Sequence, residues 1–382
     1  MKEKVKVSGL WLAFEVAALW FTTHVGGGFA MGTQEDQYFV RFGGTSFYLS
    51  FISMVVLSIV FYLTWEYQRL YGISDYKEFF DKFFGSWRRV FTSLYDVIIA
   101  IVIPLAAGAA LAGMSNALSG LLDIKISLYT GYIIAVVIVY LIASFGLKTV
   151  LKSSAWMSLG VIGVIVLVII FRLPQIASNL ANVPYKPLLG PTFLQSPFWF
   201  MLLYASFQSA AIGPYIAGGS VLKTHRDTVT AAIIGFLLNG IMLFAMCLVI
   251  AGDYPSILKE AVPLIYVVNH MSPVFKYLYA FMLLLALITT AVSMVYAGAQ
   301  RWSRYGTNAK GRWGDEKFRF KVWVIIWLII TYVVSNTGIV RIVKIGYGFL
   351  GYASIFVVVL PILILAPAKI ARKKKELSES KS

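Results

Sequence analysis

The chain has 382 residues, of which 59% are hydrophobic and only 13% are charged, and its mean hydropathy is +0.79. This composition excludes a water-soluble domain with ordinary surface chemistry and indicates a protein that crosses the membrane several times. The formal net charge of +16 does not indicate nucleic-acid binding, because the basic residues are scattered through short loops. The single cysteine, Cys247, excludes an intramolecular disulfide.

Ten apolar stretches are long enough to cross ~30 Å of hydrocarbon, and we predict an all-α integral membrane protein with ten transmembrane helices. If both termini are cytoplasmic, roughly three quarters of the 33 lysines and arginines lie on the inner side, as the positive-inside rule requires. We expect one multi-pass transmembrane domain over residues 1–382 in the cell membrane, of unknown oligomeric state. Its basic cytoplasmic tail, residues 367–382, is expected to be a disordered extension attracted to lipid headgroups. The stretches begin near residues 8, 45, 89, 126, 153, 197, 228, 273, 319 and 339.

The ten spans divide into two halves of five, at about residues 8–172 and 197–366. An odd number of spans in each half inverts the second half relative to the first, so we expect an inverted repeat. Transporters built this way unwind corresponding helices near the bilayer midplane to form a binding site. The first helix of each half carries such an interruption, at "THVGGG" (23–28) and at "SFQSAAIGP" (206–214). Pro214 suits the first turn of a new half-helix, where its missing N–H needs no partner.

Glycines in a membrane helix more often permit close helix packing than mark a break. Three adjacent glycines, however, carry a helix penalty of the order of 1 kcal/mol each, and the matching interruption in the sixth span favours a break. Broken backbone in hydrocarbon needs polar partners, so we expect a polar cavity. The N–H groups of Gly26, Gly27 and Gly28, beside Thr23, are expected to bind an anion such as an amino-acid carboxylate.

The sixth span would supply the other half of the substrate site. The carbonyls around Phe207, Gln208 and Ser209 end its first half-helix and could accept hydrogen bonds from an ammonium group. Together with the glycine amides they make a site shaped for a zwitterion. The rings of Tyr204 and Phe207 could close over a bound substrate, with core or lipid packing as an equal alternative.

Four ionisable residues of the first and third spans are candidates for a functional role. His24 titrates near neutral pH unless burial depresses it, and we expect either a substrate contact or a pH-sensing role, against a structural histidine. Glu15 and Asp96 lie in the inner parts of the first and third spans and are candidates for a gate or a proton path. Glu35 is a third candidate, although it could simply anchor the outer half-helix in water.

Two segments carry a family resemblance. "VGGGFAMGTQE" (25–35) resembles the "GAGFATGQE" segment of the YkvI-like membrane proteins, and "KIGYGFLGYASI" (344–355) resembles a segment near their C-termini. The resemblance implies membership of the amino acid/polyamine/organocation superfamily with the LeuT fold, a five-plus-five inverted repeat with helices 1 and 6 interrupted. It implies a secondary transporter but no particular substrate.

The resemblance also implies a sodium site. In sodium symporters of this fold, carbonyls of the broken first helix and hydroxyls of the eighth helix hold the ion. The matching residues here are Thr22 and Val25 in the first span and Ala286, Thr289 and Thr290 in the eighth. The alternative is that the threonine hydroxyls bond to carbonyls of their own helix.

We therefore expect a cation-coupled, sodium-driven symporter of an amino acid or related small amine that works by alternating access. The alternatives are a proton-coupled amino-acid transporter and a non-transporting nutrient receptor of the same fold. The fifth span has no lysine between residues 155 and 171, which disfavours a proton mechanism based on such a lysine. An enzyme is not expected, because metalloprotease, nucleophile and phosphate-loop motifs are absent from the sequence. The expected partners are the substrate and the lipid bilayer, with sodium as the one possible bound ion and no other metal or cofactor.

Overall fold

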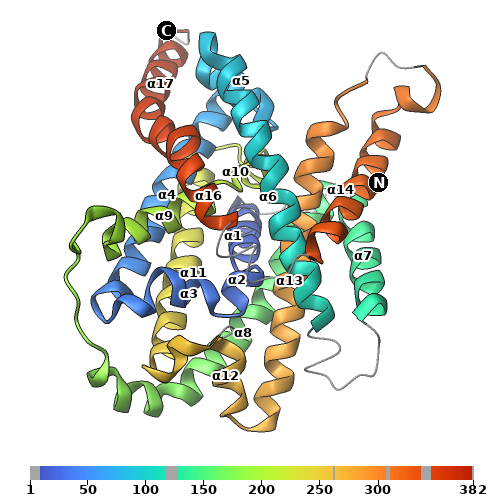
Figure 1. The fold of residues 1–382 in the computed structure, drawn as a ribbon. Helices are drawn as coiled ribbons and strands as arrows, with labels where there is room; N and C mark the ends of the chain where they lie inside the picture. The colour runs from blue at the N-terminus through green and yellow to red at the C-terminus, as the bar shows by residue number, and fades with distance from the viewer. Residues whose placement is uncertain (1–8, 117–127, 261–262, 307–309, 337–345, 381–382) are drawn as a thin grey trace.

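The computed structural model describes residues 9–116, 128–260, 263–306, 310–336 and 346–380, and every regular element within these ranges is a helix (Figure 1). The first half contains α1 (Gly9–His24), α2 (Gly27–Ala30), α3 (Thr33–Tyr38), η1 (Val40–Phe42), α4 (Thr45–Tyr71), α5 (Tyr76–Phe84), η2 (Gly85–Trp87), α6 (Arg88–Asn116), α7 (Leu128–Ser144) and α8 (Leu147–Asn179). The short turns η4 (Leu180–Asn182) and η5 (Phe193–Gln195) lead to the second half. The second half contains α9 (Pro197–Ser209), α10 (Ile212–Gly219), α11 (His225–Ala251), η6 (Ser256–Lys259), α12 (Pro263–Asn269), α13 (Pro273–Trp302), η7 (Gly311–Gly314), α14 (Glu316–Ser335), α16 (Tyr347–Ser354), the π-helical turn η9 (Ile355–Val359) and α17 (Leu360–Glu379).

The described helices are consistent with the ten predicted spans. Seven of them are long and apolar enough to cross a membrane, and the bent pair of α9 and α10 makes an eighth. The first and fourth predicted spans correspond to α1 and α7, which have 16 and 17 residues. α1 is short because its span is interrupted, and α2 and α3 continue it. The start of the tenth predicted span, at residue 339, lies outside the described residues.

Both predicted interruptions are confirmed. α1 ends at His24 and α2 begins at Gly27, without a capping side chain at Gly26. α9 ends at Ser209 and α10 begins at Ile212, with a bend of 54° between them. Pro214 occupies the first turn of α10, as its missing N–H predicts. Neither break is a surface turn, because the residues on both sides are buried.

α1 lies at the centre of the fold (Figure 1), where it contacts α8, α11 and α13. Small residues permit this close packing. Gly235 of α11 lies so near that a Cβ atom there would be 2.3 Å from the ring of Trp20. The Trp20 ring in turn meets the edge of Phe61 of α4, with 4.8 Å between centroids. The broken span is therefore held on several sides by other helices.

The C-terminal tail is helical rather than disordered. α17 continues to Glu379 and so includes most of the segment expected to be an extension. Within the helix, Arg372 and Glu376 form an i,i+4 ion pair at 3.0 Å, which supports helical structure. The Lys374 ammonium also lies 3.0 Å from the carboxylate of Glu66 on α4. The expectation of disorder was wrong, because charged residues of the tail form ion pairs within α17 and with α4.

Candidate functional site

The two interruptions border one small cavity of about 30 Å³. This volume has room for about two water molecules, so the structure is closed around the cavity. Helices α1, α3, α6, α9, α13 and α16 all contribute to its walls. The lining residues are Thr23, His24, Gly26, Gln34, Val102, Ala106, Phe207, Gln208, Ala211, Thr290, Met294, Tyr347 and Leu350.

Five of the nine residues predicted to bind substrate line this cavity: Thr23, His24, Gly26, Phe207 and Gln208. The other four, Gly27, Gly28, Tyr204 and Ser209, lie next to lining residues in the chain or in space. The Ser209 hydroxyl donates to the Ser206 carbonyl at 2.6 Å and so serves its own helix. Gly28 packs against Gln34, because a Cβ at Gly28 would lie 2.3 Å from Gln34 Nε2.

His24 connects the end of α1 to two other helices. Its Nδ1 lies 2.6 Å from Asn239 Oδ1 of α11, and its Nε2 lies 2.7 Å from the Tyr204 hydroxyl of α9. Asn239 already donates its amide N–H to the Gly235 carbonyl at 2.7 Å, so its Oδ1 accepts from His24. This assigns a ring proton to Nδ1. His24 thus bridges α1, α9 and α11.

A pair of amide side chains crosses the cavity. Gln208 Nε2 of α9 donates to Gln34 Oε1 of α3 at 3.2 Å, and the Tyr204 hydroxyl lies 3.5 Å from the same oxygen. Gln34 was not among the residues predicted from the sequence, although it stands inside the quoted "VGGGFAMGTQE" segment. The pair joins the two interrupted spans directly.

Aromatic rings cover the cavity beside α9. Phe207 stacks on two rings, with centroid distances of 5.4 Å to Tyr38 and 5.0 Å to Tyr347. Tyr204 meets the edge of Phe39 at 4.9 Å. Tyr204 and Phe207 thus pack among other aromatic rings beside the cavity, and their closing over a bound substrate stays a prediction.

The residues expected to hold sodium form an oxygen cluster between α1 and α13. Thr290 Oγ1 and Thr289 Oγ1 lie 3.0 Å and 3.3 Å from the Thr22 carbonyl. Both hydroxyls also lie 2.9 Å from the carbonyl of Ala286 in their own helix. The fifth residue, Val25, is buried in the turn after α1, where its N–H donates to Phe21. The structure therefore contains both the cross-helix contacts and the alternative contacts within α13.

Tyr95 of α6 satisfies backbone groups at the break of the sixth span. Its hydroxyl accepts from the N–H of Gly213 at 2.7 Å and donates to the carbonyl of Ala210 at 3.0 Å. Nothing in the sequence singled out this tyrosine among the 22 in the chain. One side chain thus replaces hydrogen bonds that the interrupted helix lacks.

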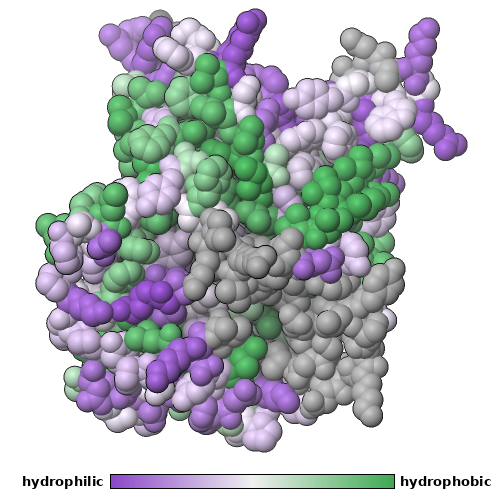
Figure 2. All heavy atoms as spheres, in the orientation of Figure 1, coloured by the Kyte–Doolittle hydropathy of each residue, from purple (hydrophilic) through white to green (hydrophobic). Residues whose placement is uncertain are grey.

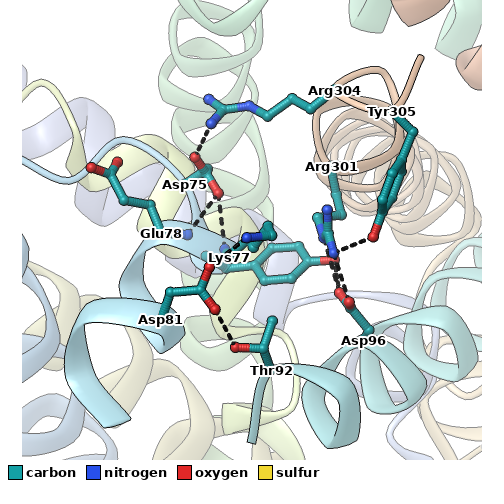
Figure 3. Close-up of polar contacts among 10 residues, drawn as sticks. Asp75, Lys77, Glu78, Asp81, Thr92, Asp96, Arg301, Arg304 and Tyr305 are labelled. Carbon is teal, nitrogen blue, oxygen red and sulfur yellow. Dashed lines mark hydrogen bonds and ion pairs between the residues drawn. The ribbon is translucent and has the colours of Figure 1, made fainter. Parts of the chain in front are cut away.

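Asp96 belongs to an ionic network that joins α5, α6 and α13 (Figure 3). Arg301 of α13 binds its carboxylate with two nitrogens, Nε at 2.9 Å from Oδ1 and Nη2 at 2.7 Å from Oδ2. The Tyr76 hydroxyl donates to Asp96 Oδ1 at 2.9 Å. Nearby, Arg304 pairs with Asp75 at the start of α5. Such a bidentate pair is geometrically specific, and it joins α6 to α13.

The two candidate glutamates have different surroundings. Glu15 is partly exposed and accepts a 2.8 Å hydrogen bond from Trp11 one turn earlier in α1. Glu35 is fully buried in α3, and within the described part of the chain neither carboxylate oxygen has a hydrogen-bond partner. The interpretation of Glu35 as an anchor in water is therefore wrong. A buried ionisable group without a partner in a membrane protein is a functional candidate.

An all-helical membrane fold whose first and sixth spans are both interrupted beside one cavity is the LeuT fold. No protein-family model matches the chain, and no curated protein sequence matches it. The resemblance to YkvI-like proteins is thus not confirmed.

Solved structures do match. One is a Na⁺-coupled sialic acid symporter in a substrate-bound outward-open state, with a TM-score of 0.69, 14% identity, and coverage of 94% of this chain and 79% of that one. MhsT in complex with L-phenylalanine has a TM-score of 0.63 at 15% identity, covering 93% and 87%. A manganese transporter of Eremococcus coleocola has a TM-score of 0.57 at 14% identity, covering 95% and 81%. At these identities the likeness shows the fold alone.

Proposed function

We propose that this protein is a secondary transporter that carries an amino acid or related small amine together with sodium by alternating access. The observation that carries the proposal is that both broken spans border one polar cavity whose wall includes Thr290 of the oxygen cluster. Transporters of this fold place substrate and coupling ions at such breaks. We further propose that the whole chain is one transport domain of two repeats, residues 8–172 and 197–366, in the cell membrane with both termini cytoplasmic.

The oxygen cluster supports sodium as the coupling ion. Hard cations prefer oxygen ligands. The hydroxyls of Thr289 and Thr290 each lie within 3.3 Å of the carbonyls of both Thr22 and Ala286. An ion would take the place of the hydroxyl protons as the partner of the Thr22 carbonyl. The Na⁺-coupled symporter among the similar structures supports the same proposal.

The chemistry of the cavity wall favours a zwitterion over a simple ion. The described lining contains no Asp, Glu, Lys or Arg, and its polar side chains, such as Gln34, Gln208 and Thr23, are neutral. An amino acid has no net charge, and neutral donors and acceptors such as these can meet its two charged groups. No cluster of three or more His, Cys, Asp or Glu occurs among the described residues, which disfavours a divalent metal as substrate. The bound L-phenylalanine of MhsT fits this proposal.

Transport requires the cavity to enlarge. A volume of about 30 Å³ does not hold an amino acid, so the Phe207 ring must move away from Tyr347 when the cavity opens to one side of the membrane. When the cavity opens to the opposite side, the ion pair between Asp96 and Arg301 must separate. We propose that α1, α4, α9, α10 and α11 rock against α6, α7, α13 and α14.

Uptake into proteoliposomes tests the proposal. The purified protein is reconstituted and offered a panel of radiolabelled amino acids and amines under an inward sodium gradient, with a potassium gradient as control. We expect sodium-stimulated uptake of at least one compound. Absence of flux under every sodium and proton gradient would contradict the proposal that the protein is a transporter.

Two alternatives are separated by the same measurements. The buried, unpartnered Glu35 favours proton coupling as the second candidate, which predicts uptake driven by a proton gradient without sodium. A nutrient receptor would bind a ligand, detected as thermal stabilisation, but would show no flux under any gradient.

A further inference from the structure

A second, larger pocket lies far from the interruptions, on the outer surface between α5, the start of α6, and α17. Its volume is about 560 Å³, within the usual range for small-molecule sites. Figure 2 shows hydrophobic surface over this region, with hydrophilic surface beyond it toward the ends of α5 and α17. The lining residues are Phe83, Phe84, Trp87, Phe91, Phe356, Leu360, Pro361, Ile364, Leu365 and Lys369.

Regular helix spacing builds the groove. On α17, Pro361, Leu365 and Lys369 recur every four residues and form one row along the helix. On the opposite wall, the rings of Phe84 and Phe91 stack in parallel, with centroids 3.9 Å apart and an angle of 2°. The row on α17 changes from apolar to basic at its C-terminal end, so the groove has an apolar length and one charged end.

The charged end carries cations without acidic partners. The Lys369 ammonium lies 5.6 Å from the centroid of the Phe83 ring. Arg88 is exposed at the start of α6, directly after the lining residue Trp87 and three residues before Phe91. Among the described residues, neither has a carboxylate partner. By contrast, Lys82 pairs with Glu78, and Lys374 pairs with Glu66. The positive charges of Lys369 and Arg88 are therefore not neutralised by acidic side chains.

We propose that this groove binds an anionic phospholipid, with an acyl chain along the apolar row and the phosphate between Lys369 and Arg88. The ligand must be apolar along most of its length and negative at one end, and a membrane supplies such molecules beside the groove. Trp87, which is 65% exposed, is of the residue type that marks the membrane interface, where a headgroup lies. Lys369 can extend its charge to this level along its apolar stem. The proposal does not depend on the transport function.

Lipid selectivity tests the site. Detergent-purified protein is titrated with dioleoylphosphatidylglycerol or dioleoylphosphatidylcholine, and binding is followed by native mass spectrometry and thermal shift. Wild type should prefer the anionic lipid. The double variant Lys369→Gln/Arg88→Gln should bind it at least about fivefold more weakly for each cation removed. Lys375→Gln is the matched control, because Lys375 lies on the same helix but pairs with Glu379.

A groove-filling variant separates the lipid from a soluble anion. Leu365→Trp should reduce lipid binding while leaving both cations in place, and size-exclusion chromatography checks that it is folded. Inorganic phosphate alone should give no stabilisation. Equal binding of the two lipids, unchanged binding in the double variant, or stabilisation by phosphate equal to that by the lipid would each overturn the proposal.

Discussion

The hydroxyl of Thr290 lies 3.0 Å from the carbonyl of Thr22 and so joins the eighth span to the end of α1. In an uninterrupted helix that carbonyl would accept from the N–H of Gly26, four residues on. Gly26 instead lies beyond the end of α1. The break thereby frees the carbonyl of Thr22 to meet a hydroxyl, or an ion, from another helix.

Replacing Thr290 with valine should abolish sodium-dependent stabilisation. The substitution keeps the shape of the side chain but removes one of the four proposed ligands, and we expect sodium affinity to fall tenfold or more. Thermal-shift titrations with sodium chloride, using potassium chloride for ionic strength, measure this. Thr331→Val, at an equally buried threonine of α14, is the control and should keep the sodium response. A full sodium response in Thr290→Val would remove this cluster from ion binding.

Replacing Gly28 with alanine should weaken substrate binding. The new Cβ would lie 2.3 Å from Gln34 Nε2, so Gln34 must move and its hydrogen bond with Gln208 must lengthen or break. We expect binding, measured by ligand-induced thermal shift, to weaken about tenfold. Gly163→Ala is the control, since its Cβ meets nothing within 4 Å; it should keep affinity and gain up to about 1 kcal/mol of stability. Unchanged affinity in Gly28→Ala would contradict a role for this contact in the site.

Replacing Tyr95 with phenylalanine should destabilise the protein. The hydroxyl serves the N–H of Gly213 and the carbonyl of Ala210, and its removal leaves both without this partner, at a cost of about 1–3 kcal/mol. A lower melting temperature in detergent is the expected result. Tyr67→Phe, at another buried tyrosine, should have a smaller effect. Similar losses in the two variants would mean that the Tyr95 hydroxyl does not support the break.

Replacing Asp96 with asparagine should open the cavity toward the ionic network in Figure 3. The change removes the negative partner of Arg301 and leaves that guanidinium buried without it. In a Cys247→Ala background, a cysteine introduced at the buried Ile99, one turn along α6, reports this opening. A hydrophilic maleimide should label Ile99→Cys severalfold faster when Asp96→Asn is also present. Lys77→Gln is the control, because it breaks only a more exposed pair with Asp81, and equal rates in all three proteins would argue against a gate.

The helical spans and their two interruptions were predictable because their causes are local. An apolar stretch of sufficient length must hydrogen-bond its own backbone in a bilayer, and the glycines and Pro214 disfavour helix where they stand. The tail shows the limit of this reasoning. Its composition suggested disorder, but the contact between Lys374 and Glu66 depends on where α4 lies.

The partners within the site were not predictable, because they come from distant parts of the chain. His24 and Asn239 are 215 residues apart, and their contact depends on how α1 and α11 pack. The same holds for Tyr95 and the break after α9. For Glu35 the sequence left a gate, a proton path and an anchor in water open, and the structure places this residue in the core. By itself, the sequence determined that this chain crosses the membrane repeatedly and where two of its helices break. Only the tertiary structure decided which side chains satisfy those breaks, since a polar group freed from its own helix takes whichever partner the packing of the other helices brings to it.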